Sequence, residues 1–450
     1  MPTTEDNRDN GALHTGALRA SIGDQIQIEG EAGPRRVTYT MGSQNKGWHA
    51  CFKGQGAVPL GRVVWEHLAS AGLSHVAKKA GVIPKTVTPP REKRSDASGA
   101  RASKFTRCNP ALPANKQAPI DADVIIHADW SGDAEEATRR LKRQYVRAER
   151  RNSKSYSVVA PKAVTDAEVW LADLVAEARG GKAVLVGFDF VIGIPKAYAK
   201  LVDRNSFIDF VKNVPAPFFE INSDIRDVST TRPFFPRNEQ CWRSVNASKG
   251  QRRLAVAQQI GVDNEHALLR RCEHATQMRG AGSPLFITSS AKQVGRATLF
   301  GWKEAIVPAL RNARDVVRVW PFDGDLRDLV CPGSLTIVET YPTETYAHLG
   351  VGGQSAKQNQ NWRREAAAQM LEVVSDSVGP SSDLKALIDD GFGGAETGED
   401  PFDALAGALG MVLVAMGRDS ADVPDDDIIR KVEGWILGLG GSVPEIANKS

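Results

Sequence analysis

Three short apolar stretches that each end on a carboxylate constrain the fold of this chain most strongly. They are VIIHAD, ending at Asp129, VLVGFD, ending at Asp189, and LTIVE, ending at Glu339. A short continuous apolar run is typical of a strand that is buried on both faces of a sheet. Sites in α/β sheets are usually built at strand ends. The pattern therefore predicts an α/β fold and makes these acids candidate catalytic residues and metal ligands.

A fourth acidic element opens the strongly apolar helix that we expect from DPFDALAGALGMVLVAMG. Asp400 and Asp403 are three residues apart, so both carboxylates can point from one helix face. Clustered carboxylates stay ionised together only if a cation neutralises them; otherwise one takes up a proton. An all-oxygen set suits Mg²⁺ or Mn²⁺. Two such ions about 4 Å apart can activate a water and stabilise the leaving oxygen in phosphodiester cleavage.

Each of these acids also has a purely structural interpretation. Asp400 suits an N-cap position, Pro401 the first helical position, and Asp403 the positive end of the helix dipole. Asp129 and Asp189 could simply terminate strands. Glu339, at the end of an apolar strand, is the hardest to explain structurally.

The order of the expected elements is strand, strand, strand, helix, strand, insertion, strand, helix. This order predicts a mixed sheet with flanking helices over residues 121–450, with a long insertion at about 196–320. A helix is expected in TDAEVWLADLVAEAR, where Thr165 and Glu168 resemble a capping box.

The first part of the chain differs in composition. Residues 1–83 contain two strand-like runs around a Gly-Pro turn and helical spacing after Val58, which predicts a small α+β module. Residues 84–120 are rich in Pro, Ser, Lys and Arg and are expected to form a flexible basic linker. This linker is a solvated spacer or a weak nucleic-acid contact, and the N-terminal module is a candidate docking site for a protein partner.

Two further segments could contact phosphate. The run 139–154 is densely basic, and Arg143 and Arg147 are its candidate phosphate ligands, although a solvated face explains it equally well. The stretch 289–296 combines small polar residues with Lys292 and Arg296, which suits a phosphate cradle or an ordinary surface loop.

Composition excludes several classes of protein. A net charge of only +3 means that any nucleic-acid contact must come from local patches. The five cysteines form no CxxC pair, so neither a zinc ribbon nor a disulfide framework is encoded. The chain has a polar N-terminus and no run of 18 apolar residues, so we expect a cytoplasmic protein without membrane contact.

Six motifs in order resemble the domain of unknown function 429 family of predicted RNase-H-like, RuvC-like nucleases. They are ADWSG, FDFVIGIP, KQVGRATLFGW, WPFDG, ETYP and EGWILGL, and they span residues 121–439. The helix motif Asp-x-x-Asp-Ala-Leu-Ala-x-Ala, at 400–408, resembles the last catalytic helix of the same superfamily. The resemblance implies an RNase-H-like domain with the first catalytic acid at Asp129. Either Asp189 or Glu339 could supply the middle ligand.

We therefore expect a Mg²⁺- or Mn²⁺-dependent nuclease that cleaves DNA or RNA. In this hypothesis Asp129, Asp403 and either Asp189 or Glu339 hold the ions, with help from Asp400. One alternative is a phosphotransferase of the actin–sugar-kinase type, although no second Gly-rich phosphate loop is evident. The other is a non-catalytic binding module in which the acids are structural.

Overall fold

The chain divides into two compact units, Met1–Ala100 and Arg101–Ser450. The computed structural model describes the side chains of residues 105–113, 116–235, 253–276, 279–288, 294–353, 356–394 and 397–443. In the first unit it describes only the backbone of four strands, β1 (Gln25–Ile26), β2 (Arg35–Ser43), β3 (Gly47–Phe52) and β4 (Ala57–Pro59). They pair antiparallel in chain order. The helix expected after Val58 lies outside the described residues.

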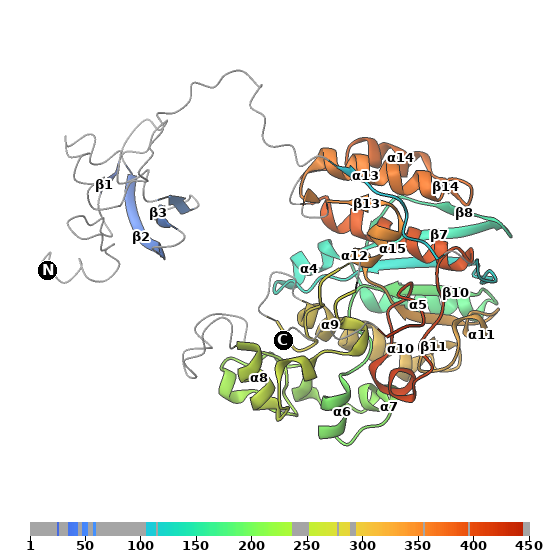
Figure 1. The fold of residues 1–450 in the computed structure, drawn as a ribbon. Coiled ribbons are helices and arrows are strands. Elements are labelled where there is room, and N and C mark those ends of the chain that lie inside the picture. Colours follow the sequence, from blue (N-terminus) through green and yellow to red (C-terminus); the bar gives the residue numbers. More distant parts are fainter. Residues whose placement is uncertain are drawn as a thin grey trace, which may run out of the picture. The chain divides into compact units, whose positions relative to one another are not determined.

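The second unit is built on one mixed sheet (Figure 1). Its strand order is β11-β12-β10-β6-β7-β8-β14, with the short β9 paired to β7. Strands β6, β10, β12 and β11 are mutually parallel, whereas β7 runs antiparallel to β6 and β8. The bounds are β6 Val124–Asp129, β7 Gln144–Asn152, β8 Ser155–Val158, β9 Lys162–Ala163, β10 Val184–Phe188, β11 Val317–Val319, β12 Leu335–Glu339 and β14 Val378–Pro380. The α/β class predicted from the apolar runs is confirmed.

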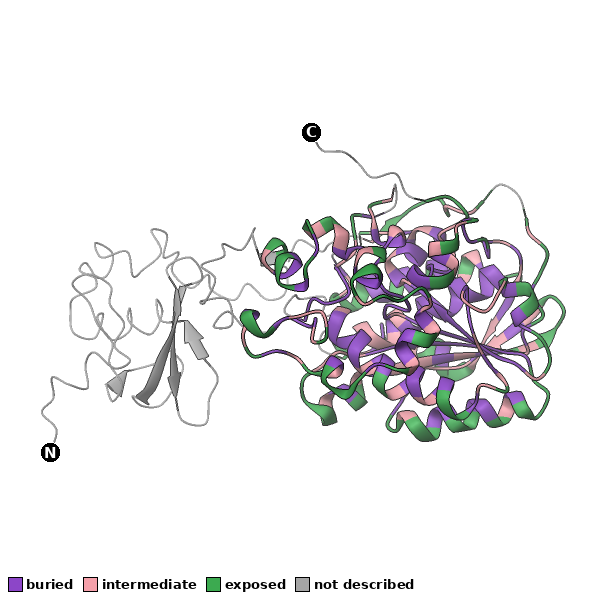
Figure 2. Ribbon diagram, turned by 90° about the horizontal axis from the view of Figure 1, so that it is seen from below, coloured by how far each residue is buried: buried purple, intermediate pink, exposed green. Residues whose placement is uncertain are grey.

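Helices cover both faces of this sheet, and the register decides which residues face each layer. Ile126, Val186 and Ile337 are in register and belong to one core cluster, which includes α5 (Ala167–Arg179). Ile125, Leu185 and Val338 alternate with them and belong to the other cluster, which includes α15 (Glu399–Ala415). In Figure 2 the buried residues accordingly run along the strands and the inner sides of the helices.

In the described parts of the long segment between β10 and β12, most of the regular elements are helices. The segment holds α6 (Lys196–Leu201), α7 (Phe207–Lys212), α8 (Arg252–Ile260), α9 (Val294–Gly301), α10 (Val307–Asn312) and α11 (Leu326–Leu329), and it contributes β11 to the sheet edge. After β12 come α12 (Pro342–His348), β13 (Val351–Gly352), α13 (Gln360–Val373), α14 (Ser382–Asp389) and finally α15.

The end of the expected linker belongs to the second unit. Strand β5 (Thr106–Arg107) pairs antiparallel with β13, and the Phe105 ring packs edge-on against Trp362 at 6.3 Å. The amide N–H of Gln117 donates to the carbonyl of Gly417 at 2.8 Å. These contacts show that the folded unit already includes Phe105 and correct the boundary that we expected at residue 121.

The start of α5 corrects a second detail. Asp166, not Thr165, is the N-cap, and its carboxylate accepts from the amide N–H groups of Glu168 and Val169 at 3.0 and 3.1 Å. The Asp166 side chain satisfies two amide groups that would otherwise lack partners, so an Asp suits this position well. Within the described part of the chain, no helix combines the length and the apolar character needed to cross a bilayer.

Candidate metal centre

Asp129 and Asp189 lie side by side at the carboxyl ends of neighbouring parallel strands. Asp129 is the last residue of β6, Asp189 directly follows β10, and the residues before them, Ala128 and Phe188, are paired in register. A hydrogen bond joins the two carboxyl groups. The backbone N–H of Trp130 donates to Asp189 Oδ1 at 2.6 Å and fixes that side chain.

Helix α15 brings Asp400 and Asp403 to the same place. Its close approach to β6 requires Gly407, because a Cβ there would lie 2.3 Å from the His127 imidazole. His127 is fully buried, and its Nε2 bonds Thr340 Oγ1 at 2.8 Å. Burial lowers the pKa of His127 to about 3, so this histidine is a neutral core residue that faces α15.

The helix begins two residues earlier than an N-cap at Asp400 would require. Gly398 is the N-cap and provides no side-chain cap, and the first helical residue is Glu399. Asp400 therefore lies inside the first turn, and its interpretation as an N-cap is wrong. A favourable interaction with the helix dipole remains open to it, since it is within the first turn.

The four aspartates interact strongly. Burial raises the pKa of Asp129 well above its usual value, and the carboxylates of Asp189, Asp400 and Asp403 raise it further. Burial also raises the pKa of Asp189 to about 6, although the Trp130 amide opposes the shift. The pKa of Asp400 is raised to about 7 by burial and then by Asp403. Such shifts show that the site disfavours several negative charges at once.

Two residues that the sequence analysis did not single out hold Asp403. The Tyr346 hydroxyl of α12 donates to Asp403 Oδ1, and Lys357 Nζ donates to Oδ2 at 2.7 Å. Lys357 also pairs with Glu399 Oε2 at 3.3 Å. Both come from the segment between β12 and α15, and no spacing in the sequence relates them to Asp403. Tyr346 lies shortly after the ETYP motif, which is the only signal that could have drawn attention to it.

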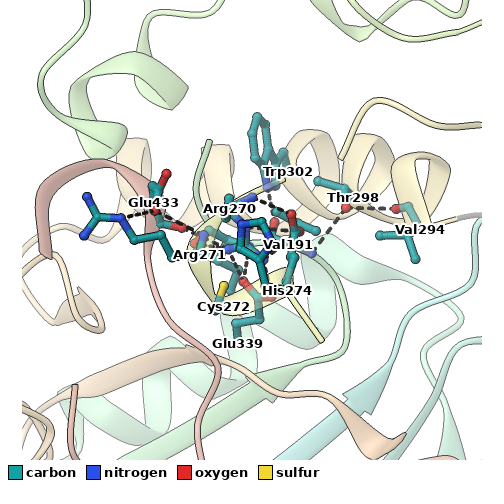
Figure 3. A network of polar contacts seen from close by, with 12 residues as sticks. Val191, Arg270, Arg271, Cys272, His274, Val294, Thr298, Trp302, Glu339 and Glu433 are labelled. Atoms are coloured by element: carbon teal, nitrogen blue, oxygen red, sulfur yellow. Dashed lines mark hydrogen bonds and ion pairs between the residues drawn. The ribbon is translucent and has the colours of Figure 1, made fainter. Parts of the chain in front are cut away.

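Glu339 has a different environment (Figure 3). Its register partner is Phe188, so it lies on the sheet face opposite that of Gly187 and Thr340. The fully buried Arg270 donates to both Glu339 oxygens, at 2.6 and 2.7 Å, and the Ile192 amide N–H donates to Oε2 at 2.6 Å. Glu339 is therefore an anchor for the insertion. The structure does not bring it together with Asp129 and Asp403, which argues against Glu339 as a metal ligand.

The Arg270 guanidinium extends this anchor to the C-terminal segment. It donates to the backbone carbonyl of Glu433 at 3.0 Å and pairs with Glu273 at 3.1 Å. Figure 3 shows Arg270 together with Glu339 and Glu433, which come from separate parts of the chain. A buried ion pair is tolerated when further hydrogen bonds satisfy its remaining polar atoms. The bonds of Arg270 meet this condition, so we interpret the pair with Glu339 as structural.

The candidate phosphate ligands are engaged within the protein or lie outside the description. Arg143 is buried, pairs with Glu304 and lies 4.5 Å from the centre of the Trp130 ring. Arg147 makes two hydrogen bonds to Glu177, at 2.8 and 2.7 Å. These contacts argue against both arginines as phosphate ligands. Arg296 is also buried, and Lys292 lies outside the described residues.

A pocket opens beside Asp189. Its volume is about 30 Å³, enough for about two water molecules. Its walls come from the ends of β10 and β12, the insertion and the C-terminal segment. The lining residues are Asp189, Val191, Glu273, Arg279, Gly282, Ser283, Val294, Glu339, Thr340, Tyr341 and Ile436. A small ligand or water in this pocket would lie beside Asp189.

The donor chemistry of the cluster fits a hard divalent cation. Its side chains offer only oxygen, and its members repel one another, which a cation would relieve. Among the described residues, however, no group of three or more acid, histidine or cysteine side chains already has the spacing of a ligand set. Lys357 supplies positive charge to the cluster instead. The carboxylates would therefore have to reorient to hold an ion.

Comparison of the chain with protein-family models, with curated proteins and with solved structures finds no match.

Proposed function

We propose that the second unit is an RNase-H-like domain and a divalent-metal-dependent nuclease acting on DNA or RNA. The observation that carries the proposal is the meeting of Asp129, Asp189 and the Asp400–Asp403 pair from three separate elements. Their order agrees with the family resemblance. The first acid ends the first strand of the sheet, the second follows the strand after helix α5, and the last pair opens the final long helix.

Asp129, Asp189 and Asp403 would hold Mg²⁺ or Mn²⁺, with Asp400 assisting. When bound, such an ion stabilises charge on a phosphodiester and promotes attack by water. The chain's own residues orient the ligands: the Trp130 amide fixes Asp189, and the Tyr346 hydroxyl fixes Asp403. The pocket beside Asp189 opens next to one member of the cluster. Lys292 remains a candidate phosphate contact.

The phosphotransferase alternative is less well supported. Its best candidate for a second phosphate loop, Gly391–Gly394, is occupied by a guanidinium. Arg363 donates to the carbonyl oxygens of Gly391, Gly393 and Gly394 at 3.0, 2.6 and 2.9 Å. A loop whose carbonyls point at a buried cation presents no amide cradle to a phosphate.

The test is a nuclease assay on single- and double-stranded DNA and RNA with Mg²⁺, with Mn²⁺ and with chelator. Cleavage by the wild type in metal, lost in Asp129→Asn and kept in Asp173→Asn, is the expected result. Asp173 is a suitable control because it is an exposed acid on α5. Absence of cleavage under every condition, together with melting that does not respond to metal, would overturn the proposal.

A further inference from the structure

Lys357 is the cation that directly contacts the acid cluster. Its ammonium lies 2.7 Å from Asp403 Oδ2 and 3.3 Å from Glu399 Oε2. About a third of its side chain is exposed (35%), whereas Asp403 is only 13% exposed. The lysine is therefore more exposed to solvent than the carboxylate that it contacts.

The backbone of Lys357 is held in place, whereas its side chain is partly exposed. The fully buried Arg363 donates to the Lys357 carbonyl at 2.8 Å. The same guanidinium holds the Gly391–Gly394 loop that leads to α15. Arg363 thus ties the lysine loop to the chain segment that presents Asp403. The flexible methylene chain of Lys357 can therefore move while the backbone stays in position.

We propose that Lys357 is the resident counter-ion of the acid cluster and that a divalent cation must displace its ammonium from Asp403 in order to bind. This inference rests on the proposed metal site and adds a residue that controls access to it. Two cations on one buried carboxylate repel each other, and the repulsion is strong where water is scarce. In the wild-type protein, Lys357 would therefore stabilise the metal-free state and weaken the binding of a divalent cation.

Substitution of the lysine separates this role from others. In Lys357→Gln the competing charge is gone, so Mg²⁺ and Mn²⁺ measured by titration calorimetry should bind about tenfold more tightly than to wild type. The metal-free melting temperature should fall, because the carboxylates lose their neutralising partner. Lys385→Gln, at an exposed position of α14, should change neither quantity. Unchanged or weaker metal binding by Lys357→Gln would overturn the proposal.

A second measurement uses the unmodified chain and does not depend on the folding of a variant. Lysine acylation by an amine-reactive ester, followed by mass spectrometry, reports how free each ammonium is. Saturating Mg²⁺ or Mn²⁺ should raise the acylation rate of Lys357 severalfold relative to Lys385. A Lys357 rate that does not respond to bound metal would show that the lysine stays on Asp403, against the proposal.

The proposed metal-dependent nuclease and the proposed counter-ion role of Lys357 can be separated by their outcomes. If wild type binds metal and cleaves, but Lys357→Gln and the acylation rate show no competition, only the counter-ion role fails. If wild type binds no metal but Lys357→Gln does, the counter-ion role stands, and the wild type is a blocked site and not a metal-dependent nuclease. If neither protein binds metal, both proposals fail.

Discussion

Glu339 and Asp189 lie at the ends of adjacent parallel strands and are offset by one residue in register. Because side chains alternate along a strand, the two carboxylates lie on opposite faces of the sheet. Glu339 pairs with Phe188, so Asp189 is aligned with Thr340 and not with Glu339. Asp189 contacts the acid cluster, whereas Glu339 receives the two N–H groups of Arg270. The geometry thus assigns the two acids different tasks.

Substitution of these two acids should have opposite effects. Asp189→Asn should keep or raise the metal-free stability while abolishing stabilisation by Mg²⁺, because it removes one of the mutually repelling charges. Glu339→Gln should cost about 3 kcal/mol, because it leaves the buried Arg270 undercompensated. Metal should still stabilise this variant. Denaturant unfolding with and without Mg²⁺ gives both quantities. Loss of the metal effect in Glu339→Gln alone would reverse the assignment.

The pH dependence of Asp400 has a definite sign. An acid whose pKa is raised in the folded state, here from 3.8 to about 7, binds more protons folded than unfolded between those values. Its contribution to stability is therefore lost as the pH rises from about 4 to about 7. Compared with wild type, metal-free Asp400→Asn should gain about 2 kcal/mol between pH 5 and pH 8. Because the comparison is made with wild type, contributions from histidines cancel. Parallel stability curves for the two proteins would contradict the shift.

Gly407 should tolerate no side chain. An alanine usually stabilises a helix by about 1 kcal/mol relative to glycine. Here the new methyl group would meet the His127 ring, and we expect a loss of about 2 kcal/mol instead. His127→Ala with Gly407→Ala should be less destabilised than the sum of the single variants, because the clash is then absent. Additive single effects in chemical denaturation would show that the helix does not rest on this histidine.

The domain boundary can be tested by truncation. A chain of residues 101–450 keeps β5 and the Phe105–Trp362 contact and should melt cooperatively. A chain that starts at residue 117 loses both and should melt several degrees lower, since exposure of apolar surface reduces stability. Equal melting temperatures in calorimetry would show that the segment 105–116 is only an attached arm.

Much of the fold follows from local patterns, but the roles of individual acids do not. The apolar runs ending at Asp129, Asp189 and Glu339 are strands, because runs of this length that are rich in Val and Ile fit a strand covered on both faces. Which acids meet depends on register, and a shift of one residue moves a side chain to the other face. The sequence does not reveal that register, so it cannot distinguish Glu339 as a metal ligand from Glu339 as the ion-pair partner of Arg270.

The charged residues illustrate the same limit. Arg143 and Arg147 belong to a basic run that suggests phosphate binding, yet each has an acidic partner far along the chain, Glu304 and Glu177. Lys357 cannot be recognised from the sequence, since a single lysine between two helices is usually a solvated surface residue. Long-range pairing decides whether a cation is satisfied internally or available to a ligand, and it is invisible to local composition.

The distance along the chain between Asp129 and Asp403 has a consequence for biosynthesis. Domains fold as they emerge from the ribosome, and contacts between distant segments form last. Asp129 is translated early, whereas α15 appears only after the whole insertion and the helices that follow β12. A ribosome-bound chain that ends before residue 399 lacks half of the acid cluster. The unfinished protein would thus carry only Asp129 and Asp189, and the cluster would be completed only when α15 docks on the sheet.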